Sequence, residues 1–444
     1  MYQSDFSPDE FRARRSRVCE AIGKDAVALL PGAPGPKGSD TFCQYNDFYY
    51  LCGVETPRAY LLVHGAGERA SLFLPYEAQL DRQSPGELIC ADKPEFVCAT
   101  TGVDEALPVA RLAQRLQAAS IVYVPFEEGQ TIGVNRHHAR SWANQAYADP
   151  WDGRPTRAAH FIDTIRKRYP HLEIRELSPI LDELRLIKSP GEVDLLRRAG
   201  HLTAVGVCEA MRSTRPGVME YQLDAVMRYH FLAGGARDRA YHAIVAGGAN
   251  AWYGHYCSND SELKDGDWVL CDCAPSYHYY VSDIGRIWPI NGTYTPEQRE
   301  LYGFVVEYHK VLLAGIRPGR MLEDIHAEAA ETMKDVLAGR RFSSPLHEQA
   351  ARAMFEFRGH LSHCVGMSVH DGGLHYTRPL EPGVVFSVDP QMRVSQEKLY
   401  IRAEDTVVVT EDGIENLTRK APLELDDVEA MMQQEGLLQV VPPA

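Results

Sequence analysis

Along the first 180 residues, stretches with a helical pattern of apolar and polar positions alternate with short apolar runs. A helix is expected over residues 7–22, where Ser7 can cap a helix that starts at Pro8. Further helical stretches are expected near residues 104–118 and 155–168. Between these stretches lie short apolar runs: "AVALLP", "FYYLCG", "YLLVH", "ASLFLP" and "IVYVP". This alternation is typical of an α/β domain.

The pattern changes near residue 180. The segment "LSPILDELRLIK" reads as an amphipathic helix, and "SPGE" then opens another helix. Ser189 as the cap, Pro190 at the first helical position and Glu192 at the third form a capping box. A chain of 444 residues is too long for one ordinary core. We therefore expect two domains, over residues 1–180 and 181–444.

The second half contains a weak internal repeat. Residues 189–217 and 295–319 each begin with Ser/Thr-Pro-x-Glu/Gln and end with Arg-Pro-Gly. A second helical stretch and then strand-like segments follow each of them. This order predicts a duplicated helix–helix–strand unit arranged about a pseudo-twofold axis. The alternative is coincidence, because proline-capped helices that end at Pro-Gly are common.

Five candidate metal ligands lie at the ends of strand-like or turn-like segments. Asp272 and Asp283 follow the first repeat, and His363, Asp389 and Glu404 follow the second. Each alone has a simpler explanation, since a single Asp is usually a turn former. Together, four carboxylates repel one another unless cations or protons intervene. The set suits two divalent cations such as manganese, cobalt, zinc or iron, and predicts a two-metal hydrolase.

Composition narrows the class of protein further. The chain is 45% hydrophobic and 24% charged, and its net charge of −15 disfavours nucleic-acid binding. Ten cysteines are scattered without a CxxC pair, which indicates free thiols in a reducing compartment. The N-terminus lacks an apolar signal core, and no apolar run approaches the ~18 residues of a membrane span. We expect a cytoplasmic protein without membrane partners.

Several motifs carry a family resemblance. Residues 184–435 resemble the pita-bread metallopeptidases, the family of methionine aminopeptidase, aminopeptidase P and prolidase. The motifs are "DWVLCDCAPSYHYYVSDIGR", "LSHCVGMSVHD", "LEPGVVFSVDP" and "RAEDTVVVTEDGIENLT". The first half is similar to the aminopeptidase P N-terminal domain through "ALLPGAPGPKGSDTFCQYNDFYYLCGVETPRAYLLV". The resemblance implies an α/β domain of the creatinase/aminopeptidase P type, followed by an α+β pita-bread catalytic domain with a pseudo-twofold repeat.

The resemblance also implies a role for each ligand. Asp272 would bind one metal ion, Asp283 and Glu404 would bridge both, and His363 and Asp389 would complete the other. The implied cofactor is a pair of divalent ions, first of all Mn²⁺, with Zn²⁺, Co²⁺ or Fe²⁺ as alternatives.

Other residues match catalytic positions of the family. His255 would shuttle protons or touch the scissile carbonyl, and His370 would polarise that carbonyl. Arg402 would support the ligand network, while Glu404 would also transfer the proton to the leaving nitrogen. Tyr241 matches an aromatic residue of the substrate pocket, although a role as a core tyrosine is equally compatible with its sequence context.

The chain departs from the family pattern at two places. Asp389 stands where the family usually has Glu, and a ligand misplaced by ~1 Å can cost ~10²-fold in rate. In "GHLSH", Gly359 occupies the position of the usual first histidine, and His360 is shifted by one residue. These departures leave open a metal-free relative such as creatinase, or a catalytically weak relative with a binding role.

The implied reaction is hydrolysis of the bond between an N-terminal residue and a following proline, as in an Xaa-Pro aminopeptidase. The alternative is a prolidase, which splits Xaa-Pro dipeptides only. The implied partners are small peptides with proline at the second position, and a homodimer or homotetramer is expected on family grounds.

Overall fold

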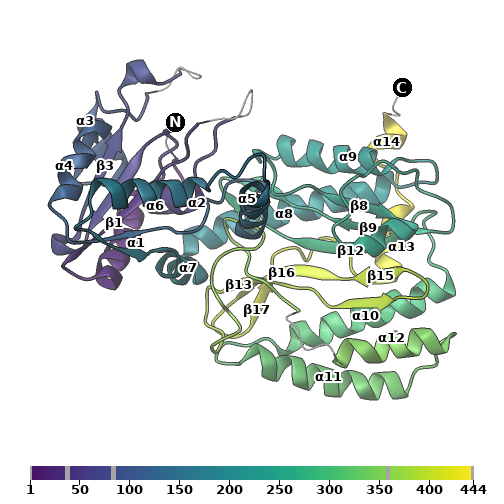
Figure 1. Cartoon of the computed structure of the whole chain (residues 1–444). Helices are drawn as coiled ribbons and strands as arrows, with labels where there is room; N and C mark the ends of the chain where they lie inside the picture. Colours follow the sequence, from purple (N-terminus) through teal and green to yellow (C-terminus); the bar gives the residue numbers. More distant parts are fainter. Residues whose placement is uncertain (1–2, 36–40, 82–86, 357–360, 442–444) are drawn as a thin grey trace. The chain divides into compact units, whose positions relative to one another are not determined.

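The computed structural model describes residues 3–35, 41–81, 87–356 and 361–441. The chain forms two compact units, Met1–Arg185 and Leu186–Ala444 (Figure 1). The boundary between them lies at the end of α7 (Ser178–Leu186), whereas the sequence pattern suggested a boundary near residue 180.

The first unit is built on a mixed sheet. Its described strands lie in the order β4-β3-β2-β1-β5-β6. The pairs β1–β2 and β2–β3 are antiparallel, while β3–β4, β1–β5 and β5–β6 are parallel. The strands are β1 (Ala26–Pro31), β2 (Tyr60–His64), β3 (Arg69–Leu74), β4 (Glu105–Pro108), β5 (Ile121–Val124) and β6 (Glu173–Glu176). The remaining helices are α1 (Pro8–Ile22), α2 (Asn46–Cys52), α3 (Pro94–Thr101), α4 (Leu112–Gln117), α5 (Arg136–Ala148) and α6 (Arg157–Arg168).

Two segments of this unit differ from the alternation of helical stretches and apolar runs in the sequence. The apolar run "FYYLCG", which lies between the expected helices, itself belongs to helix α2. Nearly every residue of α2 is buried, so no helical period of polar positions is visible in its sequence. The stretch 104–118 begins as strand β4, and only its second part is α4. Pro108 explains the split, because proline disfavours helical conformation in the residue before it.

The second unit contains the sheet β13-β16-β12-β9-β8, with β17 paired to β16. Figure 1 shows α8 and α9 on one side of these strands and α10, α11 and α12 on the other. The strands are β7 (Asp238–Arg239), β8 (Ile244–Gly247), β9 (Trp268–Asp272), β10 (Pro275–Tyr277), β11 (Tyr280–Val281), β12 (Ile284–Pro289), β13 (Val385–Val388), β14 (Gln391–Val394), β15 (Leu399–Arg402), β16 (Glu404–Val409) and β17 (Ile414–Asn416). The helices are α8 (Pro190–Ser213), α9 (Glu220–Ala233), α10 (Pro296–Gly315), α11 (Leu322–Ala338), α12 (Pro345–Glu356), α13 (Leu425–Met432) and α14 (Leu437–Val440).

Both helices that open the predicted repeats are capped as expected. In α8, Glu192 N lies 3.4 Å from Ser189 Oγ, and Ser189 N donates to Glu192 Oε2 at 3.0 Å. Thr295 and Gln298 make the equivalent pair of hydrogen bonds at the start of α10. Each reciprocal pair satisfies backbone N–H groups that a helix start leaves without partners.

The cysteines are free thiols, as the sequence predicted. Cys271 and Cys273 both point into the core, where their sulfur atoms lie 3.4 and 3.2 Å from Met227 Sδ of α9. Strand alternation then turns Asp272, between them, to the opposite face. No helix within the described parts of the chain has the length and apolar character that crossing a bilayer requires.

The packing of two helical glycines gives a matched stability test. A β-carbon at Gly200 of α8 would lie 2.6 Å from the backbone oxygen of Leu417, whereas at Gly303 of α10 the nearest heavy atom would be 4.0 Å away. We expect Gly303→Ala to raise the free energy of unfolding by about 0.5–1 kcal/mol. Gly200→Ala should lower it, because overpacking against backbone costs about 1–3 kcal/mol. Thermal and urea unfolding of both variants would measure this, and equal shifts in the same direction would contradict it.

Candidate functional site

Three neighbouring strands bring acidic side chains into one row. Asp272 ends β9, where it lies opposite Gly285 of β12, and Gly285 lies opposite Glu404, the first residue of β16. Asp283 precedes β12 directly. Asp272, Asp283 and Glu404 are all buried. Segments more than a hundred residues apart in sequence therefore place three carboxylates on one face of the sheet.

Gly285 makes room for this row. A β-carbon at this position would lie 3.1 Å from Arg402 Nε and 3.1 Å from the β-carbon of Glu404. Any larger residue would push these side chains away from the space between Asp272 and Glu404. Glycine inside a buried strand is a sign of such close approach.

The segment after residue 360 brings in the other two predicted ligands, His363 and Asp389. Ser387 N donates to His363 O at 2.9 Å, and Asp389 N donates to Leu361 O at 2.9 Å. This pairing lays residues 361–365 along β13 and directs His363 toward the row of carboxylates. Cys364 points the other way, with Sγ 3.3 Å from His375 Nδ1, as alternation along an extended segment requires.

Arg402 binds one group of carboxylates through its whole guanidinium. Its Nη1 donates to Asp272 Oδ2 at 2.8 Å, its Nε to Asp389 Oδ1 at 3.0 Å, and its Nη2 to Glu404. Asp389 is also held by Gln391, whose amide nitrogen lies 2.8 Å from Oδ2. Both oxygens of Asp389 thus have protein donors in this structure.

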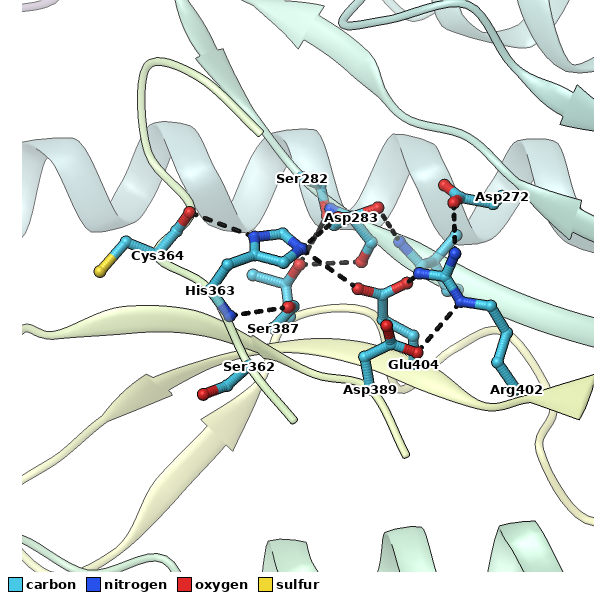
Figure 2. A network of polar contacts seen from close by, with 12 residues as sticks. Asp272, Ser282, Asp283, Ser362, His363, Cys364, Ser387, Asp389, Arg402 and Glu404 are labelled. Atoms are coloured by element: carbon cyan, nitrogen blue, oxygen red, sulfur yellow. Dashed lines mark hydrogen bonds and ion pairs between the residues drawn. The ribbon is translucent and has the colours of Figure 1, made fainter. Parts of the chain in front are cut away.

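A second group is suited to a cation. Ligand atoms of Asp283, His363 and Glu404 all lie within 4.8 Å of one another. His363 Nε2 is 3.2 Å from Asp283 Oδ2 and 3.6 Å from Glu404 Oε1. Glu404 Oε1 is buried and makes no hydrogen bond with the described residues. Figure 2 shows His363 and Arg402 on opposite sides of Glu404.

The electrostatics of the cluster favour added positive charge. Burial raises the pKa of Asp389 to about 8, against the opposing effect of Arg402. Burial also raises the pKa of Asp272, again opposed by Arg402. Burial alone would lower the pKa of His363, but the neighbouring carboxylates of Asp283 and Glu404 raise it well above the usual value. Four buried carboxylates with one arginine and one histidine fit a site that binds divalent cations.

Two residues of the cluster carried weak signals in the sequence. The Tyr241 hydroxyl lies 2.6 Å from Asp272 Oδ1 and 2.6 Å from Asp283 Oδ1, so it belongs to the cluster rather than to the core alone. Sequence reasoning missed Thr406, whose Oγ1 accepts from Asp283 N at 2.9 Å and donates to Asp283 O at 2.8 Å. The signal for Thr406 was its position two residues after Glu404, on the same face of a strand.

The predicted histidines differ in how closely the structure ties them to the cluster. The rings of His370 and His363 are 4.2 Å apart between centroids, which places His370 at the edge of the cluster. His255 is an exposed residue that follows η4 (Gly248–Tyr253), and its catalytic role stays a prediction. Gly359 and His360, where the sequence departs from the family pattern, lie outside the described residues.

Comparisons with known proteins agree with this geometry. Residues 194–411 match the metallopeptidase family M24, and residues 11–122 match the aminopeptidase P N-terminal domain. The chain is 31% identical to the Xaa-Pro aminopeptidase of Escherichia coli (strain K12), over 97% of this chain and 98% of that protein.

Solved structures extend the similarity to the fold. Proline aminopeptidase P II from Yersinia pestis has a TM-score of 0.77 at 30% identity, covering 96% of this chain and 100% of its own. Zinc-substituted E. coli aminopeptidase P in complex with product has a TM-score of 0.76 at 29% identity, covering 97% and 99%. These structures confirm the expected pita-bread fold with its N-terminal α/β domain. With similarity that spans both domains, this chain belongs to the aminopeptidase P family of metallopeptidases.

Proposed function

We propose that this protein is a metal-dependent Xaa-Pro aminopeptidase, which removes the N-terminal residue of a peptide whose second residue is proline. The observation that carries the proposal is the convergence of Asp283, His363 and Glu404, with a buried Glu404 oxygen that lacks a hydrogen-bond partner among the described residues. The relatives named Xaa-Pro aminopeptidase align over nearly the whole chain, which supports the same reaction.

Two divalent cations, first of all Mn²⁺, are the proposed cofactor. Asp272, Asp283, His363, Asp389 and Glu404 would hold them. When bound, the ions would acidify a water molecule and polarise the scissile carbonyl. The imidazole in the set favours a transition metal over magnesium or calcium.

The protein's own residues then position the substrate and move the proton. Glu404 is the proposed general base, which takes a proton and delivers it to the leaving proline nitrogen. His370, beside His363, would donate to the carbonyl oxygen, and His255 would assist from the neighbouring loop. Arg402 fixes the positions of Asp272, Asp389 and Glu404, because each of its three nitrogens donates a hydrogen bond to one of them. Tyr241 holds Asp272 and Asp283 in the same way.

Substrate length, assembly and location are further proposals. We favour longer Xaa-Pro peptides over dipeptides, because the first domain matches the aminopeptidase P N-terminal domain. Prolidase activity on dipeptides is the second candidate. A homodimer or homotetramer in the cytoplasm is proposed from the family resemblance and from the ten free cysteines.

A comparison of two substrates tests the reaction. We expect Ala-Pro-Ala, but not Ala-Pro, to be hydrolysed by the Mn²⁺-loaded protein, and a chelator to abolish the activity because the ligand cluster then lacks its cations. Release of free alanine, followed by chromatography, measures both. Cleavage of the dipeptide alone would favour prolidase. A protein that binds no transition metal and is not activated by Mn²⁺ would refute the proposed function.

Asp389 gives a second test. Glutamate is one methylene longer, and its carboxylate would extend beyond the Arg402 and Gln391 donors that now hold both oxygens of Asp389. We expect Asp389→Glu to bind Mn²⁺ more tightly, by about 10-fold, which is the lower end of the effect that the partners of a metal ligand have on affinity, and to change turnover. Calorimetry and initial rates measure these effects.

The control for this test is Asp238→Glu, since Asp238 forms an ion pair with Arg228 instead of joining the cluster. This variant should match the original protein in both affinity and turnover. Unchanged Mn²⁺ affinity and turnover in Asp389→Glu would mean that the rest of the site already compensates fully for the shorter side chain of Asp389.

A further inference from the structure

A second group of metal-type ligands lies outside the cluster described above and shares no residue with it. Its members are His347 of α12, Glu297 in the first turn of α10, and Glu397 in the turn between β14 and β15. A third carboxylate, Glu300, lies one turn further along α10. The group therefore connects three elements that are distant in sequence.

Two of the separations between ligand atoms match those of a tetrahedral site. His347 Nε2 lies 2.9 Å from Glu397 Oε2 and 3.4 Å from Glu297 Oε1, and the three ligand atoms all fall within 4.8 Å of one another. Zinc binds nitrogen and oxygen ligands at about 2.0–2.1 Å, so neighbouring ligands of a tetrahedral ion are about 3.3 Å apart. The two separations from His347 Nε2 are close to this value.

The other ring nitrogen of His347 is oriented as in metal-bound histidines. Nδ1 lies 3.2 Å from Glu300 Oε1. Glu300 is itself fixed by Ser343, whose backbone N and Oγ donate to it at 2.7 and 2.9 Å. If Nδ1–H donates to Glu300, the lone pair of Nε2 faces Glu297 and Glu397. A carboxylate behind the imidazole is the usual outer partner of a metal-binding histidine.

We propose that Glu297, His347 and Glu397 bind a divalent cation of the zinc class, with Glu300 orienting the imidazole. The imidazole is buried, with 1% of its side chain exposed, whereas Glu297 is open to solvent and leaves room for water as a further ligand. Three carboxylates around one histidine leave an excess of negative charge. The nearest arginine along α10, Arg299, does not neutralise it, because it pairs with Asp426 and Glu429.

A proton competes with the cation for the same nitrogen. Burial lowers the pKa of His347, but hydrogen bonds with Glu397 and Glu300 outweigh burial and raise it above its usual value. Cation binding must displace this proton, so affinity rises with pH as the imidazole loses it. The competing explanation is a protonated His347 held only by ion pairs, and it predicts no binding of zinc at this place.

The position of the site gives it a structural role. Glu397 lies at the turn of the β14–β15 hairpin, while the other end of the hairpin leads to Asp389 on one strand and to Arg402 on the other. A cation held by α10, α12 and this turn would fasten the hairpin at the end away from the catalytic cluster. We therefore infer that the cation fixes the position of the β14–β15 hairpin, which connects to Asp389 and Arg402 of the cluster.

Metal stoichiometry tests the proposal. The full chain is stripped of metal and titrated with Zn²⁺ alone, in parallel with the surface variant Glu297→Gln/Glu397→Gln. We expect the double variant to bind one equivalent fewer than the original protein. Glu331→Gln, which removes an exposed charge of α11 that pairs with Lys334, is the matched control and should bind the full number. Equal stoichiometry in all three proteins would overturn the proposal.

Two further measurements distinguish a cation-binding site from a set of ion pairs. Co²⁺ bound by this histidine–carboxylate set should add visible absorption that the double variant and His347→Gln both lack. Zn²⁺ should also raise the unfolding temperature more in the original protein than in the double variant. Identical spectra and identical Zn²⁺-dependent shifts would show that His347 forms ion pairs only. Hydrolysis of Ala-Pro-Ala, measured in the same preparations, reports on the proposed function separately.

Discussion

The second unit is organised around a group of carboxylates that are buried together, away from solvent. Asp272, Asp283, Asp389 and Glu404 are buried together, and carboxylates in such surroundings are strongly unfavourable unless positive charge lies beside them. The fold supplies part of that charge through the guanidinium of Arg402. The pairing of β9, β12 and β16 sets how closely the carboxylates approach, and Gly285 is the residue that allows this approach.

The opposite face of β16 carries its own charge network. Asp405 accepts from Arg286 Nη2 at 2.7 Å and from Thr418 Oγ1 at 2.5 Å, while Arg286 also donates to the backbone oxygen of Glu404. Burial raises the pKa of Asp405, but Arg286 and its neighbours outweigh burial and keep this pKa below its usual value. This face thus has balanced charges, whereas the face with Glu404 retains the excess that suits added cations.

Features that depend on neighbouring residues could be predicted from the sequence, whereas contacts between residues far apart in sequence mostly could not. The capped starts of α8 and α10, and the inward Cys271 and Cys273, followed from rules that act within a few residues. The candidate ligands were identified from their positions after strand-like segments, and the role of each followed from the family resemblance. Helix α2 was missed because burial on all sides hides helical periodicity. Gly285, Thr406 and the group around His347 were missed because their roles depend on partners about 50 or more residues away in sequence.

Side chains along β16 alternate between two faces of the sheet, and this alternation restricts where the chain can accept an insertion or deletion. Glu404 and Asp405 are adjacent, yet one faces the proposed catalytic cluster and the other faces Arg286. An insertion or deletion of one residue near the start of this strand would exchange the two faces, placing Asp405 among the carboxylates and Glu404 against Arg286. Length variation among descendants of this sequence should therefore be tolerated in the turn between β16 and β17, and rejected between Arg402 and Thr406.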